Sequence, residues 1–181
     1  MLMNKRLILM FALIFFITAC NDTTDYNNED IAVIIRGEEI TVGDLRFLYP
    51  DDQIEQNLDG VIKSTLVMQE VERLNLDVDQ VMQETLDELK SFSVADLNKL
   101  SGDNMDKFIK KQANKLKLDE EEYLQEYLKI SVKTASSMQV YTENIIGEPG
   151  DNDIEAYNIK ANQLLDDLVT DNLDEIDILY Q

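Results

Sequence analysis

The sequence predicts a mostly α-helical domain in which a short pair of β-strands joins the two ends of the folded chain. Apolar residues recur at helical spacing through residues 51–74 and 119–146. The β-branched run at residues 31–36 is too short for a helix and is typical of a strand. Residues 175–180 alternate between polar and apolar side chains, which also indicates a strand. Because a lone strand is unstable, we expect these two strands to pair.

The helices between the two strands follow from their caps and breakers. Gly37 and Glu38 suit a tight turn after the first strand, so the chain returns there before the first helix. Thr41 and Asp44 then fit the start of a short helix, which Pro50 ends. The next helix is apolar on much of its circumference, so we expect it to be central. The helices after Pro50 are predicted, in order, over residues 51–74, 79–92, 93–100, 104–118, 119–146 and 151–168. The capping pair Asp119 and Glu122 opens the helix over residues 119–146, and Asp151 caps the last helix.

The predicted helix at residues 104–118 is the one cationic stretch that follows the N-terminal segment. Its basic side chains are Lys107, Lys110, Lys111, Lys115 and Lys117. A charged helix face of this kind is most often a solvated surface that balances nearby acids. The less common interpretation is a contact surface for an anionic partner, and the sequence leaves it open.

Composition excludes several classes of function. The 181 residues include 37 acidic and 16 basic side chains, for a net charge of -21, and no histidine. Without histidine the chain cannot form a Ser-His-Asp or Cys-His site or a His-ligated zinc site. The negative charge also repels nucleic acid and anionic membrane surfaces, because both bind through Lys and Arg. We therefore expect no enzyme, no cofactor and no nucleic-acid partner.

Acidic clusters are the remaining candidates for metal binding or catalysis. Asp77 with Asp79, and the acids of residues 151–155, lack the spaced oxygens and the central glycine of a calcium loop, so we favour helix capping. Asp166 and Asp167 could act as an acid and base pair, but solvation of a helix end explains them more simply. We therefore expect no metal site.

The N-terminal segment has the pattern of an export signal. Lys5 and Arg6 precede an unbroken apolar run at residues 7–17, which is too short to span a bilayer comfortably. Residues 17–20 (ITAC) resemble the lipobox of bacterial lipoprotein precursors and contain the only cysteine, Cys20. An ordinary signal peptide, or a free thiol in a membrane-spanning tail, are the alternatives.

The lipobox resemblance implies that residues 1–19 are removed and that Cys20 carries a diacylglyceryl group. Two acyl chains such as palmitate anchor a protein stably, whereas one holds it only marginally. The mature chain would have 14 basic and 37 acidic side chains, a net charge of -23. Residues 20–30 contain almost no apolar side chains and are predicted to be a flexible lipid-anchored linker. The expected location is the extracytoplasmic face of the cell membrane.

Four segments resemble the N-terminal chaperone domain of SurA and PrsA type secretion chaperones. Residues 31–41 (IAVIIRGEEIT) are similar to the family opening A-x-V-N-G-x-x-I-T, and residues 61–76 to the helix I-D-x-x-L-L-x-Q-E-A-x-x-L-G-I. Residues 118–124 (LDEEEYL) match L-S-x-E-E-F, and residues 153–157 (DIEAY) resemble D-E-E-I-x-A-Y-Y. The resemblance implies a multi-helix fold of the SurA N-terminal type over residues 31–181.

The chain also departs from the family pattern. Arg36 stands where the family usually has Asn, and Asn75 replaces a helix-ending Gly. The sequence has neither the parvulin isomerase domain that usually follows nor the paired histidines of such domains. The resemblance therefore implies an isomerase-free chaperone module.

The predicted function is that of a non-catalytic chaperone, or holdase, for unfolded or newly exported polypeptides. Adaptable aromatic and sulfur side chains on the predicted long helix would contact such clients. The candidate client-binding residues are Tyr123, Tyr127, Met138 and Tyr141. The simpler interpretation of each is an ordinary core residue. The alternative function is a lipoprotein adaptor that binds one specific envelope protein through its acidic surface.

Overall fold

The computed structural model describes residues 26–89, 105–149 and 154–180. The elements are β1 (Ile31–Ile35), β2 (Glu38–Thr41), α2 (Val42–Leu48), the 3-10 helix η1 (Asp51–Gln53), α3 (Ile54–Arg73), α4 (Asp79–Leu89), α6 (Met105–Leu116), α7 (Glu120–Ile146), α8 (Ile154–Thr170), the 3-10 helix η2 (Leu173–Glu175) and β3 (Ile176–Ile178). The predicted fold class is thus confirmed as mostly helical with a small antiparallel sheet. The helix predicted at residues 93–100 and the cap predicted at Asp151 lie outside the described residues.

The sheet has the strand order β2-β1-β3, and both pairings are antiparallel. Val33 pairs with Ile178, so the predicted pairing of the first and last strands is confirmed. The chain returns as β2 through a two-residue turn in which Arg36 and Gly37 have φ angles of 49° and 81°. Two positive φ angles are those of a type I′ turn, whose twist suits a hairpin.

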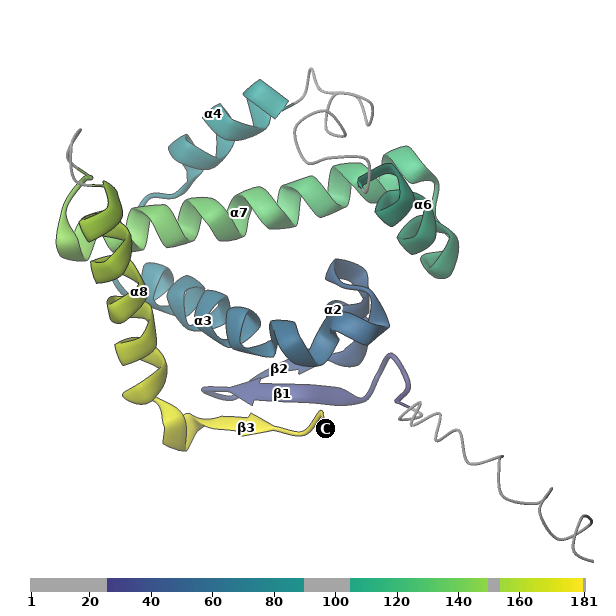
Figure 1. The fold of residues 1–181 in the computed structure, drawn as a ribbon, viewed down its shortest axis with the longest axis horizontal. Coiled ribbons are helices and arrows are strands. Elements are labelled where there is room, and N and C mark those ends of the chain that lie inside the picture. Colours follow the sequence, from purple (N-terminus) through teal and green to yellow (C-terminus); the bar gives the residue numbers. More distant parts are fainter. Residues whose placement is uncertain (1–25, 90–104, 150–153, 181) are drawn as a thin grey trace, which may run out of the picture.

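The elements are arranged in layers (Figure 1). Helix α3 covers one face of the sheet, α7 crosses α3, and α4 lies on the side of α7 that faces away from α3. Helix α8 leads from one end of α7 back to β3, and α6 lies at the other end of α7. The central position predicted for α3 is confirmed, because α3 buries side chains against both the sheet and α7.

The core of the described residues divides into four apolar clusters. One joins β1 to α3, a second joins α2 to the start of α3, a third joins α3 to α7 and α8, and a fourth joins α6 to the start of α7. Leu66 on α3 is fully buried beneath Val33 and Ile35 of β1. Helix α4 contributes no residue to any of these clusters.

Local sequence explains where the helices begin and end. Thr41 and Asp44 form the predicted start of α2 as a reciprocal capping box. Asp119 caps α7, but its side chain accepts from the backbone N–H of Glu121 and no bond pairs it with Glu122. Helix α3 ends at Arg73, and Asn75, two residues later, has a left-handed φ of 52°. Asparagine tolerates this conformation better than most residues, which explains how it replaces a glycine here.

The predicted flexible linker over residues 20–30 is wrong for its second half. The carbonyl oxygens of Asp30 and Asn28 accept from the backbone N–H groups of Val42 (2.8 Å) and Gly43 (2.9 Å). These N–H groups are at the start of α2, where a helix has no acceptors of its own. The ring of Tyr26 also stacks on Tyr180 at 4.7 Å. Residues 26–30 therefore belong to the fold although they contain no aliphatic side chain.

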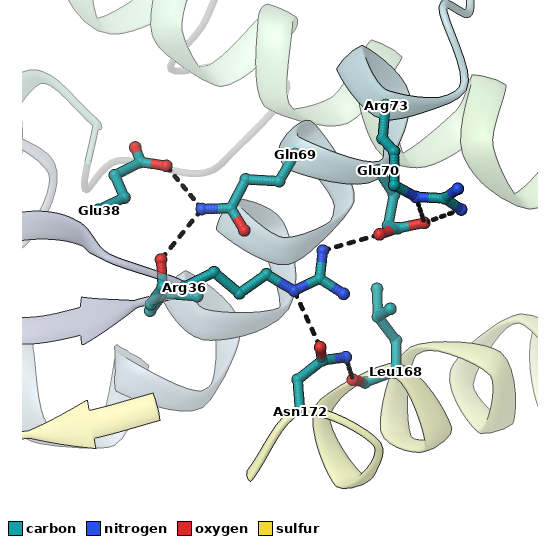
Figure 2. Close-up of polar contacts among 8 residues, drawn as sticks. Arg36, Glu38, Gln69, Glu70, Arg73, Leu168 and Asn172 are labelled. Carbon is teal, nitrogen blue, oxygen red and sulfur yellow. Dashed lines mark hydrogen bonds and ion pairs between the residues drawn. The ribbon is translucent and has the colours of Figure 1, made fainter. Parts of the chain in front are cut away.

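A polar network around Arg36 joins the hairpin to α3 and to the segment that follows α8 (Figure 2). The guanidinium of Arg36 donates to Glu70 Oε1 at 2.7 Å and to Asn172 Oδ1 at 2.8 Å. The Glu70 residue is 6% exposed and also accepts two bonds from Arg73. A left-handed non-glycine residue costs about 1–2 kcal/mol, and hydrogen bonds between charged groups contribute about as much. These bonds therefore explain how Arg36 is tolerated in place of the turn-favouring Asn.

The electrostatics of Glu70 follow from the same contacts. Hydrogen bonds from Arg73 lower the pKa of Glu70, burial opposes this effect, and the bond from Arg36 adds to the lowering. The net result is a pKa below the ordinary value for glutamate. Glu70 is thus a charged carboxylate held between two cations at neutral pH.

Candidate functional site

Two of the four predicted client-binding residues are core residues in the structure. Tyr123 is fully buried among Phe47, Phe108 and Tyr127, and its hydroxyl donates to the carbonyl oxygen of Phe47 at 2.9 Å. Burial raises the pKa of Tyr123. Tyr141 is 5% exposed and packs against α3. Neither ring is accessible to a client, so the simpler interpretation given above holds for both.

The other two candidates are half-buried and lie far apart along α7. Tyr127 packs against the cluster shared by α6 and α7, whereas Met138 packs against the cluster shared by α3, α7 and α8. At 1.5 Å per residue they are about 16 Å apart along the helix. The four residues therefore do not share one open surface. Helical spacing placed them on the same helix but did not show that α3 and α6 cover them.

An apolar recess lies instead between α4 and the first half of α7. Three leucines form its apolar walls, namely Leu86 and Leu89 of α4 and Leu128 of α7. Among the described residues, Gln125, Glu126 and Lys129 of α7 also line the recess, and its volume is about 250 Å³. The described part of the recess thus combines leucine walls with polar groups of α7.

The local sequence explains how α4 presents Leu86 and Leu89. Asp77 accepts from the backbone N–H of Asp79 at 3.0 Å, so it acts in the helix capping that the sequence favoured. The apolar side chains of α4 lie on one side of the helix and are half-buried against α7. No residue of α4 is fully buried. The apolar face of α4 is therefore covered only in part.

Sequence reasoning missed this recess. The one-sided apolar pattern of the 79–92 segment was visible, but the helix that it would face was not. A short helix with a narrow apolar face and an acidic opposite face is a usable signal for a weakly covered surface. Aromatic side chains were predicted to contact clients instead, although large rings are also common in cores.

A second, smaller recess lies where α3 ends. It has a volume of about 200 Å³ and lies between the end of α3, the segment that leads into α4, and α7. Its apolar walls come from Met68, Val71, Leu76 and Val78. Its other lining residues are charged or polar, namely Glu72, Asp77, Asp79, Lys133 and Ser137. Because polar and charged residues form a larger share of its lining, it is a poorer apolar site than the recess between α4 and α7.

The predicted lipidation site, Cys20, is among residues 1–25 and therefore lies outside the described residues. Within the described ranges, no group of three acidic or cysteine side chains is placed to hold a metal ion. Asp166 makes an ion pair with Lys63 at 2.7 Å, which links α8 to α3. In the part of the chain that the structure describes, no helix is both long and apolar enough to cross a bilayer.

Comparison with known proteins leaves the family open. No family model matches the chain, and no match was found among curated proteins or solved structures. The resemblance to secretion chaperones therefore depends on the quoted sequence segments alone.

Proposed function

We propose that this chain is a lipid-anchored lipoprotein of the extracytoplasmic membrane face that acts as a holdase, in the manner of an isomerase-free SurA or PrsA type chaperone. The lipobox at residues 17–20 supports the anchor. The four family-like segments support the chaperone type. The observation that carries the proposal is the apolar recess between α4 and α7, formed by Leu86, Leu89 and Leu128.

The size of the recess favours a side chain over a small molecule as its occupant. Small-molecule sites usually have volumes of about 300–1,000 Å³, and this recess has about 250 Å³. One large apolar side chain of an unfolded client would fit it, while the client backbone stays outside. The long flexible remainder of the client would then keep most of its conformational freedom.

The expected affinity is low. Full burial of one large apolar side chain contributes about 1.5–3 kcal/mol, and a Kd of 1 mM already needs about 4.1 kcal/mol. One recess alone therefore binds more weakly than 1 mM. A holdase profits from rapid release, and many anchored copies at the membrane would supply repeated weak contacts.

Aggregation of a refolding client protein tests this proposal. The chain from residue 21 onward is added in several-fold excess, and light scattering follows aggregation with time. We expect Leu86→Asp to weaken suppression several-fold, because a carboxylate would enter the apolar recess. Ile159→Asp is the matched control, because Ile159 is 64% exposed on α8 and lines neither recess described above. Equal suppression by both variants would refute the assignment of the recess.

Crosslinking separates the holdase from the alternative adaptor. A photoreactive residue at position 86 in the full chain would label clients in living cells. A holdase should label many exported proteins, and each only weakly. One saturable partner would instead indicate an adaptor.

A further inference from the structure

Helix α6 presents a cationic face on an otherwise acidic protein. Its inner side is formed by Ile109, Gln112 and Ala113, which are buried. The opposite side is exposed and consists of Lys107, Lys110, Lys111 and Asn114. We refer to these four residues as the lysine face.

The lysine face lies at the end of the molecule where the described chain begins. Gln112 of α6 donates to the backbone oxygens of Arg46 at 2.9 Å and Tyr49 at 3.0 Å. The side chain of Arg46 in turn donates to Asn28 at 2.8 Å. Arg46 thus connects α6 to Asn28, which belongs to the segment that follows the anchor. Figure 1 shows α6 and the start of β1 at one end of the molecule and α8 at the other.

The tether between the anchor and this end is short. Residues 21–25 separate Cys20 from Tyr26, where the described fold begins. Even a fully extended chain would span only about 20 Å from Cys20 to Tyr26, whereas α7 alone is about 40 Å long. A lipid on Cys20 would therefore keep the α6 end of the domain near the membrane whatever conformation the tether adopts.

The charges around α6 determine how it meets that surface. Lys110 pairs with Asp106 at 3.3 Å and Lys115 pairs with Asp51 at 2.8 Å, whereas Lys107 and Lys111 make no ion pair within the described ranges. The acids that follow α6 in the sequence are Asp119 and those of the first turn of α7, namely Glu120, Glu121 and Glu122. At physiological salt a charge is screened beyond about 8 Å. The exposed lysines of α6 therefore act at short range, where screening weakens the effect of acids elsewhere in the chain.

We propose that the lysine face of α6 docks on anionic lipid headgroups in the leaflet that holds the Cys20 lipid. This inference rests on the lipid anchor of the proposed function and names a second membrane contact for it. Each lysine near an anionic surface strengthens binding roughly fivefold. The tether supplies a high local concentration, so a small number of lysines suffices. Docking directs α8 away from the bilayer.

Fluorescence quenching in vesicles tests the docking. The full lipidated chain is placed in vesicles of phosphatidylcholine, alone or mixed with phosphatidylglycerol, that contain a headgroup spin label. Because Cys20 is the only cysteine and its sulfur carries the lipid, Asn114→Cys provides a single free thiol for a fluorophore. Asn158→Cys on α8 is the matched control, since both asparagines are exposed on helices.

We expect strong quenching at position 114 in the anionic vesicles. Quenching should fall several-fold in phosphatidylcholine alone and in 1 M salt, where the screening length is about 3 Å. Position 158 should stay bright throughout. The charge reversal K107E/K111E should remove quenching at position 114, whereas K133E/K160E, with the same charge change elsewhere, should keep it.

Three results would overturn the docking. The first is equal quenching at positions 114 and 158. The second is quenching at position 114 that does not depend on anionic lipid. The third is a chain that does not float with the vesicles, which would remove the anchor as well. Aggregation suppression by the wild-type chain, measured in parallel, separates the two proposals: its absence would refute the holdase and leave the docking intact.

Discussion

Helices α3 and α4 both pack against α7, yet they are held very differently. Helix α3 lies between the sheet and α7 and buries nine residues, whereas α4 contacts α7 from one side and buries none. The stability of a domain is not uniform, and elements with few buried contacts open first. The comparison indicates that the fold is maintained around α3 and that α4 is held more loosely against α7.

The largest expected effect is the contrast between two leucine truncations. Leu66→Ala empties a fully buried site under the sheet, so we expect a loss of about 2–5 kcal/mol in the free energy of unfolding. Leu86→Ala removes a half-buried side chain of α4, so we expect a loss below about 1.5 kcal/mol. Urea titrations measure both. Equal losses would show that α4 is as firmly packed as α3.

The next effect concerns the polar network that ties α3 to the hairpin. Glu70→Gln removes the charge that Arg36 and Arg73 share, so we expect a loss of about 1–3 kcal/mol in the free energy of unfolding. Glu72→Gln is the matched control, because Glu72 is exposed two residues further along α3. This control should change stability by less than about 0.5 kcal/mol. An equal effect of both substitutions would mean that the network contributes nothing.

The same network predicts a pH dependence. The pKa of Glu70 is lower in the folded protein than in the unfolded chain. Its contribution is therefore complete above the unfolded pKa of about 4.3 and is lost as the pH falls through the lower folded value. The difference in unfolding free energy between wild type and Glu70→Gln should shrink in that acidic range. A difference that stays constant down to the lowest pH would contradict the lowered pKa.

The smallest effect concerns the segment that precedes the sheet. A Cβ at Gly43 would lie 2.9 Å from the backbone oxygen of Asn28, so Gly43→Ala must displace residues 26–30. We expect a loss of about 1 kcal/mol and faster hydrogen exchange in that segment. Gly60→Ala is the control, because Gly60 lies within helix α3 with open space around it. This change should stabilise the protein by about 0.5–1 kcal/mol.

Local patterns in the sequence predicted most of the fold. The Thr41 and Asp44 cap, the central α3 and the β1–β3 pairing each depend on signals within a few residues of one another, or on the need of a strand for a partner. What failed depended on contacts between distant residues. The order of residues 26–30 comes from acceptors for the start of α2, and no composition rule contains that information.

The candidate site was less predictable for the same reason. Helical spacing placed Tyr123 and Tyr141 correctly on α7, but their burial depends on how α3 and α6 pack. The recess formed by Leu86 and Leu128 arises only when two helices meet. The position of α6 beside the start of the fold likewise depends on bonds to Arg46 and Tyr49.

The central position of β1 in the sheet has a consequence for biosynthesis. During synthesis, one edge of β1 can pair with β2 soon after β1 has been made, but the other edge has no strand partner until β3 has been made. Val33 of β1 pairs with Ile178 of β3, so the nascent chain keeps an open strand edge until β3 has been made. Open edges attract other strands, and distant pairing is slow. This domain is therefore most vulnerable to aggregation while it is still being synthesised.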